Sequence, residues 1–215
     1  MEHINLWEIK APAYHILRKL WPLSCILSGE NNNATAMLSR FAMKKMAILD
    51  IGCGTGNGLE VIPVGNIYIG VDLSFKMLFH MRERFKGRAI QANGYNLPVK
   101  KETVDLVFAM GILEYQKDAG IFLSRISRPI KEGGHLFLTS SPPSWHNSLR
   151  KLNGSLLWPR DVDEVVSEAG NAGLCCEETT RSLLQEQFLF VKKAPENRTA
   201  TQPHDTECRM RTPVR

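Results

Sequence analysis

Short apolar runs alternate with amphipathic segments through most of this chain. The runs occupy residues 46–51, 67–72, 88–92, 104–110, 135–140, 174–180 and 188–191, and lengths of this order are typical of buried strands. Between them, segments 74–85, 119–130 and 161–171 carry apolar residues at helical spacing, and Ser74 stands where an N-cap is expected. The alternation predicts a mostly parallel sheet with helices on both faces, ending in a hairpin-like pair with one antiparallel strand.

The two ends of the chain follow different patterns. Residues 6–20 have apolar positions at helical spacing, which predicts an amphipathic helix. Pro22 and the polar run 28–33 are expected to end it, and residues 34–45 predict a second helix that leads into the first strand. Residues 194–215 are polar and without periodicity, which predicts a disordered tail.

Three alternate glycines follow the first predicted strand. Gly52, Gly54 and Gly56 suit a sharp turn or a close-approaching ligand, and a helix predicted from residue 57 would turn its first N–H groups toward the same space. The spacing does not fit the dinucleotide-binding pattern, because no glycine stands three places after Gly54 or Gly56. Asp72 ends the second strand twenty positions after Gly52, where doubly wound folds bring a carboxylate to a ribose diol. The alternative role for Asp72 is a turn acid before the next helix.

The run from Asp50 reads acidic-x-Gly-x-Gly-x-Gly, which resembles the first motif of the class I S-adenosylmethionine-dependent methyltransferases. The segment that begins at Asn93 resembles the family's Asp-Ala-x-x-Leu-Pro-Phe, with Asn in place of Asp, and Lys131-Glu-Gly-Gly resembles its Lys-Pro-Gly-Gly turn. The resemblance covers about residues 46–193 and is nearest to the type-11-like group that includes quinone-biosynthesis enzymes. It implies a three-layer Rossmann-like fold with a mostly parallel seven-stranded sheet and one antiparallel strand.

The resemblance implies that S-adenosyl-L-methionine is the cofactor. The binding residues that it implies are Asp50, Gly52, Cys53, Gly54, Gly56, Asp72, Leu73, Asn93, Gly94 and Met110. Asp72 would accept hydrogen bonds from the ribose diol, and the Asn93 side-chain carbonyl would accept from the adenine amino group. A packed thiol is expected at Cys53, and the methionines of segment 74–85 are expected in the core.

The candidates for catalysis are Glu114, Tyr115 and His146. The first two follow the fourth strand, and His146 lies in a loop after the fifth strand that also holds Trp145 and Trp158. The histidine can equally be a surface residue, and the tryptophans can either wall the acceptor site or close the core. Alignment of the reactants can suffice without any general base. No metal site is expected, because the five cysteines contain no Cys-x-x-Cys.

Three parts of the chain are expected. Residues 1–45 form a helical segment that either covers the active site as a lid or completes the core, residues 46–193 form the cofactor-binding domain, and residues 194–215 form the tail. A net charge of +5 without a concentrated basic patch makes a nucleic-acid partner unexpected. No apolar run is long enough to span a bilayer and no secretory signal is apparent, so the cytoplasm is the expected compartment.

The expected acceptor is a small molecule, because the segment after the fourth strand lacks the Asn-Pro-Pro-Tyr or Pro-Cys motifs of base-modifying enzymes. Four other points stay open. An RNA or protein methyltransferase shares the same cofactor motifs. A non-catalytic scaffold could keep the fold. An aminopropyl transferase would use a related cofactor on the same fold, but the sequence shows no paired carboxylates arranged to receive a polyamine. The sequence does not determine the oligomeric state.

Overall fold

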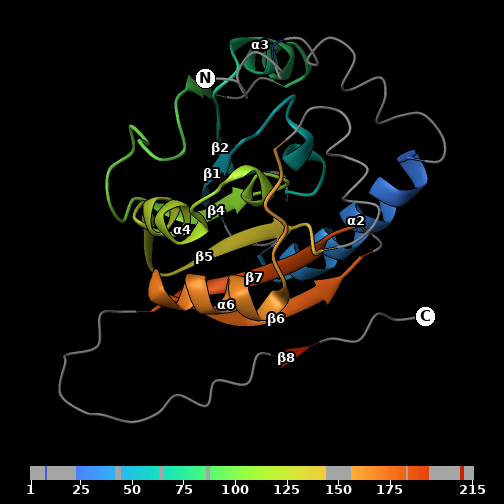
Figure 1. The fold of residues 1–215 in the computed structure, drawn as a ribbon. Helices are drawn as coiled ribbons and strands as arrows, with labels where there is room; N and C mark the ends of the chain where they lie inside the picture. The colour runs from blue at the N-terminus through green and yellow to red at the C-terminus, as the bar shows by residue number, and fades with distance from the viewer. Residues whose placement is uncertain are drawn as a thin grey trace.

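The structure is a computed structural model that describes Glu8 and residues 23–41, 45–62, 65–85, 88–143, 156–182, 184–193 and 209–210. Within these ranges the strands form one eight-stranded sheet in the order β3-β2-β1-β4-β5-β7-β6-β8 (Figure 1). The strands are β1 (Ala47–Ile51), β2 (Ile67–Asp72), β3 (Arg88–Gln91), β4 (Val104–Ala109), β5 (Ile130–Ser140), β6 (Leu174–Arg181), β7 (Glu186–Lys192) and β8 (Arg209–Met210).

The sheet changes strand direction only at β7. Strands β3, β2, β1, β4 and β5 pair with one another in parallel, and β7 is antiparallel to both β5 and β6. The chain winds outward in both directions from β1 and β4, which places the topological switch point between these two strands. The predicted Rossmann-like sheet with one antiparallel strand is confirmed. The two-residue β8, parallel to β6, was not predicted.

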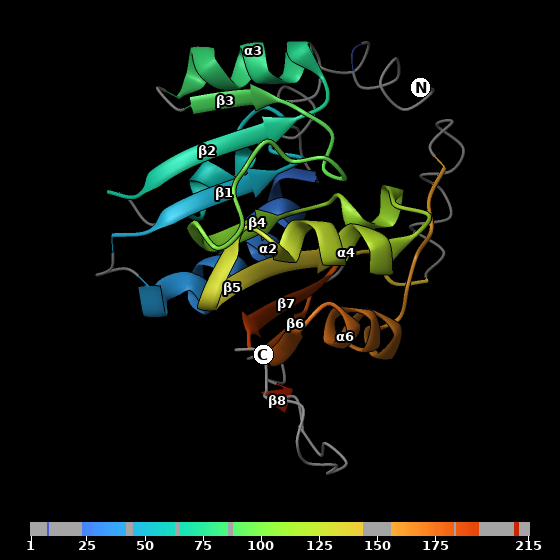
Figure 2. The ribbon, with the colours of Figure 1, turned by 90° about the vertical axis from the view of Figure 1, so that its left-hand side faces the viewer.

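Helices cover both faces of the sheet. Figure 2 shows α4 (Ala119–Ser127) and α6 (Val162–Asn171) on one face and α2 (Leu23–Leu38) on the other. One buried cluster joins the sheet to Phe122 and Val165, and the other joins it to Leu38 and to Met81 of α3 (Phe75–Arg84). Each fully buried side chain of this size contributes about 1.5–3 kcal/mol to stability, so the two clusters hold the strand ends in fixed positions.

One helix contradicts its prediction. The polar run 28–33 does not end a helix but lies inside α2, which continues to Leu38 and is followed by a 3₁₀ turn, Ser39–Phe41. The reason is tertiary contact: the buried side chain of Glu30 accepts a hydrogen bond from Ser182 Oγ at 3.2 Å, and its carbonyl accepts from Gln187 Nε2 at 2.9 Å. Such contacts offset the low helix propensity of Gly and Asn, which costs roughly 0.5–1 kcal/mol per residue.

Two other boundaries also differ. The helix predicted from residue 57 is only a four-residue 3₁₀ helix, Asn57–Glu60. The helix predicted over 119–130 ends at Ser127, and the predicted turn at 131–134 belongs to β5, whose register with β4 shifts between Val104 and Leu106. The predicted N-cap is present, because Ser74 Oγ accepts from Met77 N at 3.2 Å.

Some predictions fall on parts of the chain that the structure does not describe. These are the helix at 6–20, apart from Glu8, the loop that holds Trp145 and His146, and the tail at 194–215 apart from β8. Across the described ranges, no helix is both long enough and apolar enough to cross a bilayer.

Candidate functional site: a cavity at the switch point

The glycine loop, residues 52–56, leaves the carboxyl end of β1. Gly52, Gly54 and Gly56 have φ angles of 70°, 53° and 86°, a region that favours glycine. At Gly52 a Cβ would also lie 2.6 Å from Ile112 Cδ1, so this position requires glycine on steric grounds as well. At Gly54 a Cβ would meet nothing within 4 Å. The loop is therefore closely packed at its start and open at its centre.

Several N–H groups of this loop are used inside the protein. Gly52 N and Cys53 N donate to the Val71 carbonyl at 2.8 and 3.1 Å, and Gly54 N donates to Asp72 Oδ2 at 2.9 Å. The sequence predicts a helix from residue 57 whose first N–H groups face a ligand. The structure has only the four-residue 3₁₀ helix Asn57–Glu60 at this position. The N–H groups of Gly52, Cys53 and Gly54 therefore already have partners inside the protein.

Asp50 lies at the end of β1 and is 2% exposed. Tyr68 of β2 donates its hydroxyl to Asp50 Oδ2 at 2.5 Å, and a Cβ on Gly58 would come within 2.6 Å of the same oxygen. Burial raises the pKa of Asp50 to about 7, the Tyr68 hydrogen bond opposes the rise, and the charge of Asp72 adds to it. The Asp50 carboxyl therefore changes its charge near neutral pH.

The raised pKa of Asp50 predicts a pH-dependent stability. Between pH about 4 and about 7 the folded chain holds a proton on Asp50 that the unfolded chain has lost, so raising the pH through this window lowers the free energy of unfolding. Asp50→Asn removes this titration. We expect the free energy of unfolding of the wild type, measured with urea, to fall relative to that of Asp50→Asn between pH 4.5 and 7. Above pH 7 the difference between the two proteins should stay constant. A pH-independent difference would contradict this prediction.

Asp72 is the last residue of β2 and lines the same cavity as the glycine loop. Its Oδ1 accepts from Ser74 N and its Oδ2 accepts from Gly54 N, both at 2.9 Å. Burial raises the pKa of Asp72, and these backbone hydrogen bonds oppose the rise. Asp72 is thus a turn acid, as one sequence alternative holds. Each carboxylate oxygen has further lone pairs, so Asp72 retains acceptor capacity for a ligand.

Asn93 and Gly94 follow β3 at the same edge of the sheet. Asn93 Oδ1 accepts from Tyr95 N at 3.0 Å, which makes a local turn, and its oxygen retains a second lone pair. A Cβ on Gly94 would lie 2.8 Å from Phe122 Cε2, so this glycine lets the turn approach α4 closely. Both residues line the cavity.

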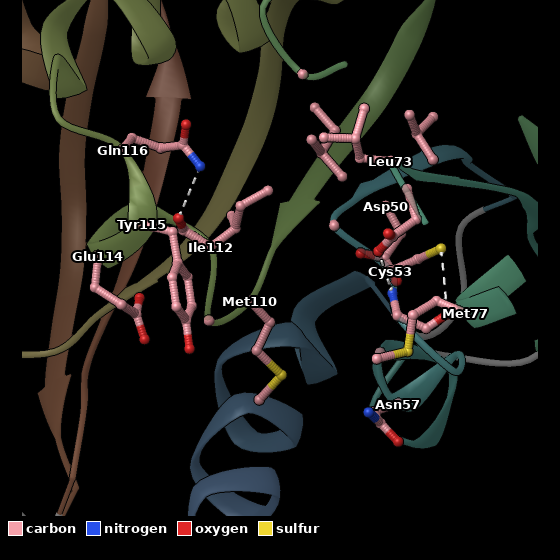
Figure 3. A pocket seen from close by; sticks show the side chains of 18 of the residues that line it. Asp50, Cys53, Asn57, Leu73, Met77, Met110, Ile112, Glu114, Tyr115 and Gln116 are labelled. Atoms are coloured by element: carbon pink, nitrogen blue, oxygen red, sulfur yellow. Dashed lines mark hydrogen bonds between the residues drawn. The ribbon is translucent and has the colours of Figure 1, made fainter. Parts of the chain in front are cut away.

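The segment after β4 forms another wall. Figure 3 shows Glu114 and Tyr115 on one side of the cavity, Asp50 and Cys53 on the other, and Met110 between them. Glu114 is fully buried, and its Oε1 accepts from Ser141 Oγ at 3.0 Å. A carboxylate and a phenol therefore face the space beyond the glycine loop.

Arg160 fixes the wall formed by this segment. Its guanidinium donates to the carbonyls of Leu113, Trp158, Gln116 and Lys117 at 3.4, 2.9, 2.8 and 2.8 Å, and only 5% of the residue is exposed. Gln116 and Lys117 directly follow the three-residue 3₁₀ helix Leu113–Tyr115, and the Leu113 carbonyl also accepts from Gln116 N at 2.9 Å. Arg160 thereby determines where the cavity-lining segment lies.

These elements enclose a cavity of about 520 Å³, a size suited to small ligands. It collects most of the residues that the sequence singles out: Asp50, Gly52, Cys53, Gly54, Asp72, Leu73, Asn93, Gly94, Met110, Glu114 and Tyr115. Gly56 does not line it, because this glycine packs against Met81 and Phe85. Met77 lines it, although the sequence predicts a purely core residue. Among the described residues that line the cavity there is no tryptophan.

Sequence reasoning missed several residues that support the site. Tyr68 and Arg160 are described above, and Arg84 of α3 holds the glycine loop by donating to the Thr55 carbonyl and to Glu60 Oε1, both at 3.0 Å. No local motif marks these residues. Each acts through a partner at least 18 positions away, so only the folded chain reveals its role. Within the described ranges no cluster of His, Cys, Asp or Glu could hold a metal ion.

Comparison with known families agrees with this geometry. Residues 49–138 match the family described as a methyltransferase domain, and this match confirms the resemblance to the class I S-adenosylmethionine-dependent methyltransferases. The matched range runs from β1 to β5 and so includes the glycine loop, Asp72 and Glu114.

Several of the curated proteins that this chain resembles in sequence are also named methyltransferases. A probable S-adenosylmethionine-dependent methyltransferase of Mycolicibacterium smegmatis is 33% identical over 131 residues, which cover 57% of this chain and 51% of that protein. A ubiquinone/menaquinone biosynthesis C-methyltransferase of Campylobacter jejuni is 26% identical over 146 residues, which cover 62% of this chain and 60% of that protein. The chain thus spans about half the length of the curated relatives it matches.

Solved structures share the fold. The magnesium protoporphyrin IX methyltransferase of Synechocystis, crystallised with S-adenosylhomocysteine, superposes with a TM-score of 0.72 at 14% identity and covers 90% of this chain and 100% of that chain. At this identity the likeness concerns the fold alone.

Proposed function

We propose that this chain binds S-adenosyl-L-methionine in the switch-point cavity and transfers its methyl group to a small-molecule acceptor. The observation that carries the proposal is the Asp72 carboxylate beside the open space at Gly54, within a cavity of about 520 Å³. The chemistry of the lining fits this ligand: the cavity offers room for it, and the side-chain oxygens of Asp72 and Asn93 retain lone pairs that can accept from hydroxyl and amino groups. The matched methyltransferase domain supports the same assignment.

Each part of the cavity has a task under this proposal. Asp72 would accept hydrogen bonds from the ribose diol, and Asn93 Oδ1 would accept from the adenine amino group. Gly54 would leave room for the methionine part, and Met110 would lie at the passage to the acceptor end. These roles use lone pairs that remain after the hydrogen bonds inside the protein.

When bound, the cofactor supplies a methyl carbon on a sulfonium, so the acceptor's lone pair forms the new bond while the carbon–sulfur electron pair stays on sulfur. The protein's contribution is to align the acceptor with that carbon, and such alignment can lower a bimolecular barrier by roughly 7–11 kcal/mol. Glu114 would receive a proton from the acceptor, and the Tyr115 hydroxyl would hydrogen-bond to the acceptor and orient it. A base of this kind adds about 10²- to 10⁴-fold in rate.

The names of the relatives favour a small acceptor, since they include ubiquinone biosynthesis methyltransferases. The volume of the cavity also suits a small acceptor. A methyltransferase acting on RNA would instead bind a polyanion with a steep dependence on salt.

Calorimetric titration of the purified chain tests the proposal directly. We expect S-adenosylmethionine and S-adenosylhomocysteine to bind with one site per chain, and NADH, which serves as the dinucleotide control, not to bind. Absence of binding by either sulfur ligand to folded protein would refute the enzyme assignment and favour a scaffold role. Salt-sensitive binding of a model RNA would shift the acceptor from a small molecule to RNA.

A further inference from the structure

Part of the wall of the cavity, here called its acceptor end, is built by elements outside the matched methyltransferase domain. Leu27 and Glu30 of α2 line it together with Gln185, which lies between β6 and β7. The two elements are joined, because Ser182 Oγ donates to Glu30 Oε1 and Gln187 Nε2 donates to the Glu30 carbonyl. This acceptor end is therefore a fixed surface of the fold.

Gln185 contributes an unsatisfied acceptor to this end. Its Oε1 is buried without a hydrogen-bond partner among the described residues, and its Nε2 lies 3.8 Å from where a Cβ on Gly111 would stand. Gly111 directly follows Met110, so the amide lies next to the passage between the two ends of the cavity. A buried carbonyl oxygen without a partner is costly, and a ligand that donates a hydrogen bond removes this cost.

The charged side chains that line the cavity also favour a ligand that donates hydrogen bonds. Its described lining contains four carboxylates, those of Glu30, Asp50, Asp72 and Glu114, and no Lys, Arg or His. Asp50 and Asp72 stand by the glycine loop, whereas Glu30 belongs to the acceptor end and Glu114 lies across the cavity from Asp50 (Figure 3). Both are buried, at 2% and 0% exposure, and each accepts a hydrogen bond from a serine hydroxyl. Buried carboxylates repel an anionic ligand and are stabilised by a cationic one.

We propose that the methyl acceptor is an amine that binds in its protonated form, with Glu30, Glu114 and the Gln185 carbonyl as its partners. This inference rests on the proposed function. The ammonium must lose one proton before its nitrogen can form a bond, and that proton passes to the Glu114 carboxylate. The nitrogen then holds the lone pair that accepts the methyl carbon. An acceptor carrying a carboxylate or phosphate at this end is disfavoured.

A set of three cofactor-site ligands tests the charge preference without knowledge of the acceptor. S-adenosylhomocysteine has no charge at the transfer position, S-adenosylmethionine has a sulfonium, and sinefungin has a primary amine on the carbon that replaces the methylsulfonium. We expect sinefungin to bind at least about tenfold more tightly than either other ligand, because hydrogen bonds to charged groups are strong. In Glu114→Gln the affinity for sinefungin should differ by no more than about threefold from the affinities for the other two ligands. The affinity of this variant for S-adenosylhomocysteine should equal that of the wild type.

The matched control is Glu83→Gln, which makes the same charge change on an α3 side chain that is 56% exposed and outside the cavity. It should keep the full preference for sinefungin. If Glu114→Gln does not fold, Glu30→Gln gives the same comparison. A wild type without the preference, or a variant that weakens S-adenosylmethionine and sinefungin equally, would overturn the amine assignment. Failure of all three ligands to bind would instead refute the proposed function.

Discussion

Asp72→Ala is expected to weaken binding of S-adenosylhomocysteine by about 100-fold or more. The substitution removes a carboxylate able to accept from two ribose hydroxyls, and hydrogen bonds to charged groups contribute about 1.5–3 kcal/mol each. It also frees the Gly54 N–H, which now donates to Asp72 Oδ2 at 2.9 Å and ties the glycine loop to β2. Isothermal titration calorimetry at constant pH measures the change.

Asp105→Asn is the matched control for Asp72→Ala. Asp105 is a carboxylate near the start of β4, where it accepts from Ala47 N at 2.7 Å and from Lys131 Nζ at 2.6 Å, and it does not line the cavity. We expect this variant to lose some stability and to keep its affinity for the ligand. Equal affinities of wild type and a folded Asp72→Ala chain would show that Asp72 is only a turn acid, which would remove the main support for the cofactor assignment.

The parts of the site that the sequence predicts are those built from contiguous residues at strand ends. Asp50 to Gly54, Asp72 and Asn93 each follow a short apolar run, and parallel strands bring their carboxyl ends to one edge of a sheet. The hydrophobic pattern alone therefore determines that these residues meet. The turn role of Asp72 was one of the two sequence alternatives. The hydrogen bond between Asn93 and Tyr95 was not foreseeable, because it depends on turn geometry at a single residue.

The acceptor end could not be predicted in this way. The run 28–33 has the composition of a helix breaker, and its contacts with Ser182 and Gln187 help to keep it inside α2. Gln185 lies in a connection whose sequence carries no motif. Residues that are distant in sequence form this end, and their contacts override local propensity. The same reason explains why the fold class is readable from the sequence and the acceptor chemistry is not.

Arg160 connects the part of the site that the sequence predicts with the part that it does not. It holds the predicted segment after β4 in place through hydrogen bonds that no sequence motif indicates. We expect Arg160→Ala to lower the free energy of unfolding by about 3 kcal/mol, since it removes a buried guanidinium that donates to four carbonyls. The amides of Tyr115 and Gln116, which donate to the carbonyls of Ile112 and Leu113, should also lose protection against hydrogen exchange. Urea unfolding and exchange measured by mass spectrometry test both effects.

Two further variants separate the carbonyl contacts of Arg160 from its charge. Glu164→Gln removes the ion pair between Arg160 Nε and the half-exposed Glu164 Oε1, which are 3.3 Å apart. This change should lower the free energy of unfolding by at most about 1 kcal/mol. Arg160→Lys keeps the charge but has fewer donors in a different geometry, so its stability should fall between those of Arg160→Ala and the wild type. If Glu164→Gln were as unstable as Arg160→Ala, the ion pair would be the source of the stabilisation. The segment after β4 would then owe its position to packing, and Arg160 would have no direct part in shaping the cavity.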